Sequence, residues 1–256
     1  SALRLDAGLN YEYSDLNVTG DADAHRKLKF LKPSVTLDWK NKSGFHGQLS
    51  VRRTVAQLNF YDFISAAELS ADRVNGGNAN LQPQRAWEFR ATVEKPVLND
   101  GLVKLDLGYD HISMLQDRIL ICDELLQCFD APGNLGTGKR AFANLTVDAP
   151  LTFIGLKGAR LKFTGNVQRT RVEDPISGEM RNFSDYFPEW EWTVDYRHDI
   201  GAFSYGFTVQ DRARFTFFRT DEFDSNWNGA PYGTAFVEYR PGPRTAVTFD
   251  VDNLFS

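Results

Sequence analysis

The sequence predicts an all-β fold, on the basis of three observations. Apolar and polar residues alternate with a period of two through most of the chain, as in strands with one apolar and one polar face. Many of these runs are about ten residues long, and none has the period of an amphipathic helix. The connections alternate between short turns and long polar segments. We therefore expect about eleven antiparallel strands in up-and-down order.

The alternating runs can be followed in order along the chain. In the first run, for example, Leu3 and Leu5 flank Arg4. Side chains two residues apart point to the same side of a strand, so each run gives one apolar face and one polar face. The clearest runs lie near residues 3–13, 34–39, 87–94, 103–110, 143–148, 161–168, 190–197, 203–210 and 247–252.

The connections between runs are sorted by length. Short turns are expected at residues 41–44, 98–101, 199–202 and 240–243, with a slightly longer one at 153–159. Long polar segments are expected at residues 18–26, 60–82, 118–138, 173–187 and 219–231. Short periplasmic turns and long extracellular loops are typical of outer-membrane barrels. The predicted fold class is therefore an antiparallel up-and-down transmembrane β-barrel fragment.

Composition is compatible with such a barrel. The 256 residues are 42% hydrophobic, and no apolar stretch approaches the roughly 18 residues that a membrane helix needs. A membrane strand alternates lipid-facing and lumen-facing residues, so a mean hydropathy of -0.40 does not exclude one. A net charge of -5 without a basic stripe argues against nucleic acid as a partner. Aromatic residues near strand ends predict girdles at the membrane interfaces: Tyr11, Tyr13, Trp39, Tyr109 and Tyr239.

Three parts of the sequence resemble, in order, motifs of one known family. Leu31–Leu37 and Ser50–Phe60 resemble a Leu-Pro-Ser strand followed by a Ser-Arg-Thr strand. Gly77–Gln84 resembles the motif Gly-Asn-Pro-x-Leu-Lys-Pro-Glu, and Val251–Phe255 resembles Val-x-Asn-Leu-Phe. The family is the TonB-dependent receptors. Gln57, Leu58, Ala79 and Gln84 stand where the family usually has other residues, so the motifs do not define a substrate.

The resemblance implies a barrel of about 22 strands with an N-terminal plug domain. Residues 1–256 then form a partial barrel domain with about half of the strands, and we expect the plug, the early strands and the closing strand to be absent from it. A partial barrel has unpaired edges that lipid does not tolerate, so we expect these residues to act within a larger receptor.

The resemblance also implies a function. The expected protein is a receptor and transporter in the outer membrane of a Gram-negative bacterium. It would take up a scarce substrate, such as a siderophore or a saccharide, with energy from the TonB complex. The expected partners are the TonB complex, through the plug region, outer-membrane lipid and lipopolysaccharide, and a small-molecule or oligosaccharide ligand. No bond is made or broken, so neither enzymatic activity nor a cofactor is expected.

Two alternatives remain open at this stage. The first is a soluble, secreted β-sandwich that binds carbohydrate, in which Trp190, Phe207 and Phe249 would pack in a core about 10 Å thick. The second is a barrel enzyme, which needs a convergent cluster of His, Ser or Asp at the rim. The histidines do not suggest such a cluster, because they are scattered: His25, His46, His111 and His198.

Candidate ligand-binding residues lie in the long loops and the upper lumen. Aromatic side chains there can stack on a sugar or an aromatic chelator: Tyr61, Phe63, Tyr186, Phe187, Phe223, Trp227 and Tyr232. The lumen-facing Arg52 and Arg90 can hold an anionic group. The alternative for each residue is packing within the loops or the rim.

Two loops carry residues with further chemistry. Cys122 and Cys128 fit a small loop disulfide formed in an oxidising compartment, and two free thiols are the alternative. Residues 224–229 resemble the first half of a calcium loop, with Asp224, Asn226 and Asn228 as candidate ligands. The twelfth position holds Ala235 instead of an acidic residue, so a polar turn is the alternative.

Two further features have simpler explanations. Residues 133–139 match a phosphate-binding loop on paper, but Arg140 replaces the expected Ser or Thr and an alternating strand follows instead of a helix. We therefore expect a glycine-rich loop entering a strand. Arg53 falls on the nominally lipid-facing side of its strand. It can reach lipopolysaccharide phosphates, or a bulge can turn it towards the lumen.

Overall fold

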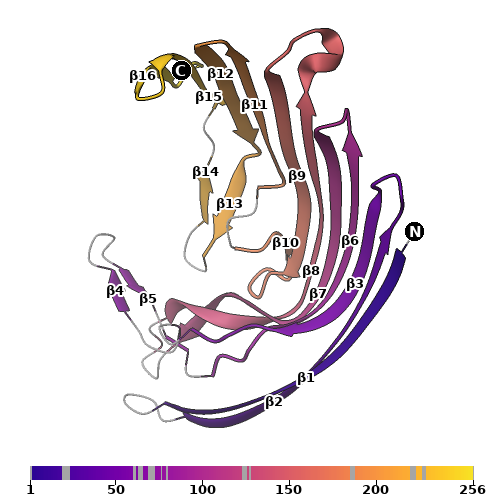
Figure 1. Ribbon diagram of the computed structural model, residues 1–256. Helices are drawn as coiled ribbons and strands as arrows, with labels where there is room; N and C mark the ends of the chain where they lie inside the picture. Colours follow the sequence, from indigo (N-terminus) through magenta and orange to yellow (C-terminus); the bar gives the residue numbers. More distant parts are fainter. Residues whose placement is uncertain are drawn as a thin grey trace.

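The computed structural model consists mainly of one large, curved antiparallel sheet (Figure 1). It describes residues 2–18, 24–59, 62, 66–68, 73–75, 77–78, 80–122, 126, 128–184, 188–219, 223–226 and 229–255. The sheet curves so strongly that it has a concave inner face and a convex outer face. Within the described residues, no helix is both long enough and apolar enough to cross a bilayer.

The main path of the sheet follows the order of the chain. Its strands are β1 (Ala2–Val18), β2 (Ala24–Lys40), β3 (His46–Val55), β6 (Arg85–Val97), β7 (Gly101–Cys122), β8 (Cys128–Pro150), β9 (Ala159–Glu173), β11 (Trp190–Ile200), β12 (Phe203–Arg212), β15 (Tyr232–Gly242) and β16 (Thr245–Asp252). Each strand pairs antiparallel with its neighbours. The predicted up-and-down arrangement of about eleven strands is therefore confirmed.

Five short strands and one 3₁₀ turn complete the described secondary structure. They are β4 (Ala66–Glu68), β5 (Arg73–Asn75), β10 (Met180–Arg181), β13 (Phe215–Phe218), β14 (Phe223–Asn226) and η2 (Leu151–Ile154). Strand β10 pairs with β9, while β4–β5 and β13–β14 are separate hairpins. Figure 1 shows β10, β13 and β14 on the concave side of the large sheet, so loop segments fold into the space that the sheet encloses.

Short and long connections lie at opposite ends of the strands, as the sequence predicts. The short turns are gathered at the top of Figure 1, and the long connections are at the bottom. One predicted loop is wrong: most of residues 118–138 is strand. Strands β7 and β8 remain paired as far as Cys122 and Cys128. Their pairing with the neighbouring strands β6 and β9 ends earlier, at Ser113 and Lys139. Apolar residues in this extension, such as Ile119, favour strand over an irregular polar loop.

The two faces of the sheet differ sharply in chemistry. Trp190, Phe207 and Phe249 leave 40%, 39% and 69% of their surface exposed on the convex face. Many large apolar side chains share this face, among them Leu3, Leu5, Leu9, Val35, Leu49, Phe89, Leu107, Leu145, Val167 and Val237. A soluble sandwich would bury them in a core, so the sandwich alternative is wrong.

The register keeps the two faces separate. Between β11 and β12, Val194 lies opposite Val209, and one residue further along Asp195 lies opposite Thr208. The Thr208 hydroxyl donates to the Asp195 carboxylate over 2.7 Å. A slip of one residue would exchange the faces of a whole strand, so the alternating sequence fixes the pairing.

Alternation changes phase once along β7 and β8. Ile112 and Leu115 are both buried although they are three positions apart, because Met114 has a φ of 57° and interrupts the extended conformation. Gly136 on β8 stands at the same level, where Met114 and Gly136 are left out of the regular pairing of the two strands. Beyond this level the odd-numbered residues of β7 face the concave side.

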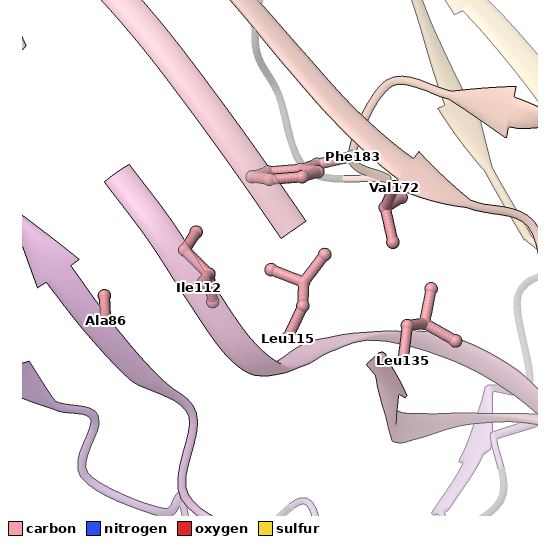
Figure 2. Close-up of a cluster of buried hydrophobic side chains, with 6 residues drawn as sticks. All are labelled: Ala86, Ile112, Leu115, Leu135, Val172 and Phe183. Carbon is pink, nitrogen blue, oxygen red and sulfur yellow. The ribbon is translucent and has the colours of Figure 1, made fainter. Parts of the chain in front are cut away.

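The change of phase creates a small hydrophobic core on the concave face. Figure 2 shows Phe183 pointing from a loop towards side chains of β7 and β8. The members of this core are each less than 9% exposed: Ala86, Ile112, Leu115, Leu135, Val172 and Phe183. Gly138 makes room for it, because a Cβ there would lie 3.0 Å from Leu115 and 3.1 Å from Phe183. The predicted glycine-rich loop at residues 133–139 is therefore part of strand β8, where its glycines allow close packing.

The close approach of strands predicts a position that cannot accept a side chain. A Cβ at Gly206 would lie 2.1 Å from the backbone oxygen of Tyr196, whereas a Cβ at Gly136 would meet nothing within 4 Å. We expect Gly206→Ala to lower the free energy of unfolding by about 1–3 kcal/mol, because the strands must separate. Urea unfolding in lipid vesicles, with Gly136→Ala as control, measures the difference. Equal stability of the two variants would contradict the packing described here.

Candidate ligand-binding cavity on the concave face

A cavity of about 690 Å³ opens on the concave face, towards the long connections. Its wall is formed by strands β3, β6, β7 and β8 together with loop residues, including Asp62, Leu81 and Phe183. Charged and apolar side chains both line it. This combination is typical of sites that bind a small molecule by stacking and by a few polar contacts.

One row of charged residues crosses four strands at the cavity. Arg52 lies opposite Glu88, Glu88 opposite Asp110, and Asp110 opposite Arg140. Like charges directly opposite each other destabilise a sheet, so the Glu88–Asp110 pair needs compensation. Arg90 supplies it, since its guanidinium lies 2.5 Å from Asp110 and 3.4 Å from Glu88. Together with Arg90, the row is therefore a network in which each carboxylate lies between two guanidinium groups.

The arginines at each side of the row are held by further contacts. Arg52 Nε donates to Glu88 over 2.7 Å, and Arg140 lies 4.0 Å from Asp110 and donates to Gln168 over 3.1 Å. The guanidinium of Arg140 also sits 4.7 Å above the ring of Phe142, and that of Arg90 sits 5.0 Å above the same ring. Contact with an aromatic face orients a guanidinium without using its N–H donors.

A loop segment, residues 174–184, forms another part of the wall. The Asp117 side chain accepts the backbone N–H of Ser184 over 3.0 Å and lies 3.5 Å from Arg181. The hydroxyl of Thr170 accepts the N–H of Phe183 over 3.1 Å. These contacts hold the loop against β7 and β9 and place Phe183 in the core.

The same segment is closed by a partly buried ion pair. Arg181 leaves 10% of its side chain exposed and lies 2.8 Å from Asp174. Burial alone would raise the pKa of Asp174, but hydrogen bonds from the backbone of Ser177 and Ile176 and from Arg181 lower that pKa to about 2. The carboxylate is thus ionised at neutral pH and ties the turn to Arg181.

Asp62 faces the cavity from the loop that follows β3. Burial raises the pKa of the Asp62 carboxyl, and the positive charge of Arg118 opposes that rise. Arg118 in turn lies 3.3 Å from Asp130, whose side chain is 2% exposed. On this side of the cavity Arg118 therefore interacts with two carboxyl groups.

The predicted binding residues have different locations. Arg90 lines the cavity, Arg52 lies beside it, and Tyr232 lines a second concave cavity of about 710 Å³. Phe223 is described only by its backbone in β14. Tyr61, Phe63, Tyr186, Phe187 and Trp227 lie outside the described residues.

The candidate calcium ligands cannot be compared with the structure in the same way. Asp224 and Asn226 belong to β14 and are described only by their backbones, and Asn228 lies outside the described residues. In the parts of the chain that the structure covers, no group of three or more His, Cys, Asp or Glu side chains is arranged to hold a metal ion. The calcium site therefore remains a prediction.

Sequence reasoning missed the partners of the two arginines. Glu88, Asp110 and Arg140 each stand on the polar side of an alternating run, and this was the only signal that could have indicated them. Their common row depends on the register of three strand pairs. Phe142 was missed too, because it occupies a position on the polar face where a charged or small residue is usual.

The second cavity is chemically different from the first. Most of its polar lining residues are uncharged amides and hydroxyls, although Glu191, Asp211 and Arg212 also line it. Among the amides, the Asn166 side chain donates to that of Asn144. Thr146, Thr164 and Thr193 continue the same polar surface across β8, β9 and β11. The charged cavity is therefore the better candidate for holding an ionised group.

The remaining predicted features can also be placed. Cys122 and Cys128 lie opposite each other at the tip of β7 and β8 and are joined by a disulfide. The guanidinium of Arg53 lies 5.5 Å from the centre of the Trp87 ring, its neighbour across the strands. An aromatic neighbour of this kind suits an arginine at the edge of an apolar face.

The architecture defines a class of protein. A curved antiparallel sheet with an apolar outer face, a charged inner face and length-sorted connections is the wall of an outer-membrane type of barrel. The family model described as "TonB dependent receptor-like, beta-barrel" matches residues 1–254. The chain belongs to the TonB-dependent receptor barrel family. No curated protein sequence matches the chain.

Solved structures share this fold at low sequence identity. The chain is similar to "Copper transporter OprC", with 13% identity and a TM-score of 0.74 over 99% of this chain and 39% of that one. It is similar to the FrpB iron transporter from Neisseria meningitidis, with 13% identity and a TM-score of 0.72 over 100% and 39%. For the siderophore receptor PirA from Acinetobacter baumannii the values are 11% and 0.65, over 98% and 39%. The chain thus spans about two fifths of each of these structures.

The lowered pKa of Asp174 predicts a response to acid. A pKa of about 2, below the ordinary 3.8, means that the ionised carboxylate stabilises the docked loop at neutral pH. This stabilisation is complete above the ordinary pKa and is lost as the pH falls towards 2. A spin label at Ile176→Cys should therefore stay ordered down to roughly pH 4 and become mobile below it. With Asp174→Asn, the label should be mobile at every pH, and loosening already near pH 6 would contradict this account.

The disulfide predicts the reactivity of the two cysteines. In the oxidised, folded protein, neither Cys122 nor Cys128 should react with a maleimide, because both sulfurs are bonded. After reduction the protein should take up 2 labels, one for each cysteine in the sequence. Ile176→Cys, at an exposed position, is the positive control for access. Labelling of the unmodified protein without reductant would show that the cysteines are free.

Proposed function

We propose that this chain is the C-terminal part of the barrel of an outer-membrane receptor that takes up a scarce small molecule with energy from the TonB complex. The family to which the chain belongs supports this proposal, since TonB-dependent receptor barrels are outer-membrane proteins of Gram-negative bacteria. The exposed convex face supports it as well. Large apolar side chains cover that face, and contact with lipid removes them from water.

The proposed receptor is larger than the described sheet. Both β1 and β16 are edge strands, and unpaired backbone groups at a sheet edge are not tolerated in lipid. Further strands of the same receptor would pair with these edges and close a barrel of about 22 strands. A plug domain within the barrel would make the contact with the TonB complex. The receptor moves its ligand without making or breaking a covalent bond, so it is not an enzyme.

The charged cavity is the proposed ligand site. It faces the side with the long connections, which in such barrels is extracellular. Arg90 and Arg140 can donate to carboxylate, catecholate or hydroxyl oxygens, and Phe183 and Phe217 add apolar surface to the wall. These groups suit a metal–siderophore complex or an oligosaccharide. Of the similar structures, one is called a copper transporter, one an iron transporter and one a siderophore receptor.

The observation that carries the proposal is the position of the charge network. Arg52, Glu88, Asp110 and Arg140 form one row across the concave face; the last three line the charged cavity, and Arg52 lies beside it. A row of fixed charges inside a water-filled barrel can hold a polar ligand on its way through. If the concave face were instead filled with apolar side chains, burying these charges there would be costly.

Uptake by the full-length receptor tests the proposal. We expect uptake of one member of a panel of ferric siderophores and oligosaccharides, and its loss when TonB is deleted or the proton-motive force is collapsed. Arg140→Gln should weaken binding of that ligand at least about tenfold, because one charge-assisted hydrogen bond is lost. Arg160→Gln is the matched control: Arg160 pairs with Asp148 over 2.6 Å at the opposite end of the sheet, away from the cavity.

Each outcome has a clear meaning. Uptake that persists without TonB would contradict the energy coupling. Equal binding by Arg140→Gln and Arg160→Gln, with unchanged folding of both variants, would contradict the placement of the ligand in the charged cavity. Folding of each variant is checked by heat-modifiable migration in gels.

A further inference from the structure

The turn between β8 and β9 exposes several large apolar side chains. Phe153, Ile154 and Leu156 are 61%, 59% and 38% exposed, and they occupy a 3₁₀ turn with its following residues. The turn is one of the short connections at the top of Figure 1, which is the proposed periplasmic end. Side chains of this size are unusual in a short turn that faces only water.

Hydrogen bonds fix the turn to the convex side of the sheet. The Lys157 carbonyl lies 3.0 Å from Nε2 of His198, and the Gly158 carbonyl accepts the backbone N–H of Asp199 over 3.0 Å. His198 is 6% exposed, and its Nδ1 lies 2.9 Å from the hydroxyl of Tyr205. Tyr205 belongs to the apolar outer face, so the end of the turn lies over that face.

The neighbouring turn continues the same apolar surface. Ile200 and Phe203, at the connection between β11 and β12, are 53% and 52% exposed. The ring of Phe203 stacks on Tyr239 with 4.6 Å between centroids. We call Phe153, Ile154, Leu156, Ile200 and Phe203 together the apolar rim. Through Tyr205 and Tyr239 it is continuous with the aromatic residues at this end of the convex face.

We propose that the apolar rim inserts into the headgroup region of the periplasmic leaflet and is covered there by phospholipid. This inference rests on the proposed membrane placement of the barrel. Continuity with the lipid-facing surface supports it, because the same bilayer that covers Tyr205 and Tyr239 extends over the turns beside them. Lys157 adds charge complementarity, because it is exposed, follows Leu156 directly in the chain and can meet a phosphate.

The consequence is an anchor that fixes the depth of the barrel. Girdle aromatics set the position of a barrel by their preference for the interface. The apolar rim extends this preference beyond the strand ends to the turns. The bonds of His198 to the turn and to Tyr205 would keep the rim in a constant position relative to the girdle.

Spin labels on the full-length receptor in phosphatidylethanolamine–phosphatidylglycerol vesicles test the proposal. Collision rates of a nitroxide with oxygen report lipid, and collision rates with a water-soluble nickel chelate report water. The label is placed at Ile154→Cys, with two controls. Leu145→Cys lies in the middle of the lipid-facing side of β8, and Ile176→Cys is an equally exposed isoleucine, 63% exposed, in the turn at the other end of β9.

The expected result is an oxygen-to-nickel ratio at Ile154→Cys that is severalfold higher than at Ile176→Cys and approaches that at Leu145→Cys. Equal ratios at Ile154→Cys and Ile176→Cys, with a lipid-like Leu145→Cys, would overturn the rim proposal and leave the barrel in the membrane. A water-like ratio at Leu145→Cys would overturn the membrane placement itself. Phe153→Cys provides a second labelled position if Ile154→Cys does not fold.

Discussion

The structure depends on one constraint: neighbouring strands must pair so that apolar residues meet on one side and polar residues on the other. Between β1 and β2, Leu5 lies opposite Leu37, and one residue earlier Arg4 lies opposite Asp38. The same arrangement continues through the sheet to β16. A shift by one residue would bring charged side chains to the apolar convex side. In the proposed receptor this would cost several kcal/mol for each charge near the membrane centre.

The charge network of the inner face follows from this constraint. Strands that present only polar residues inwards bring some like charges together, as at Glu88 and Asp110. Arg90 and Arg140 approach the same Asp110 carboxylate, and Arg52 approaches Glu88, so the repulsion is offset within one row. The groups that stabilise the wall are therefore also the groups available to a polar ligand, which connects the packing of the sheet to its proposed function.

The end of the sheet that carries the long connections obeys a different rule. At Met114 and Gly136 the alternation changes phase. Between this level and the long connections, Leu115, Leu135 and Phe183 form a core like that of a small soluble domain. A loop that packs through such a core can have a fixed position without lipid or a second domain. The cavity is consequently bounded by a rigid sheet on one side and by a docked loop on the other, which favours a preformed binding site.

The sequence by itself determined the fold class, the number of strands, the orientation of their faces and the family. These follow from the period of two, as at Leu3 and Leu5, and from short motifs such as Val251–Phe255, which are local properties of the chain. It predicted Arg90 at the cavity but not its partners, and it treated residues 118–138 as a loop. Only the tertiary structure decided the charged row and the docking of Phe183, because both depend on pairing between residues far apart in the chain, and such pairing leaves no local pattern.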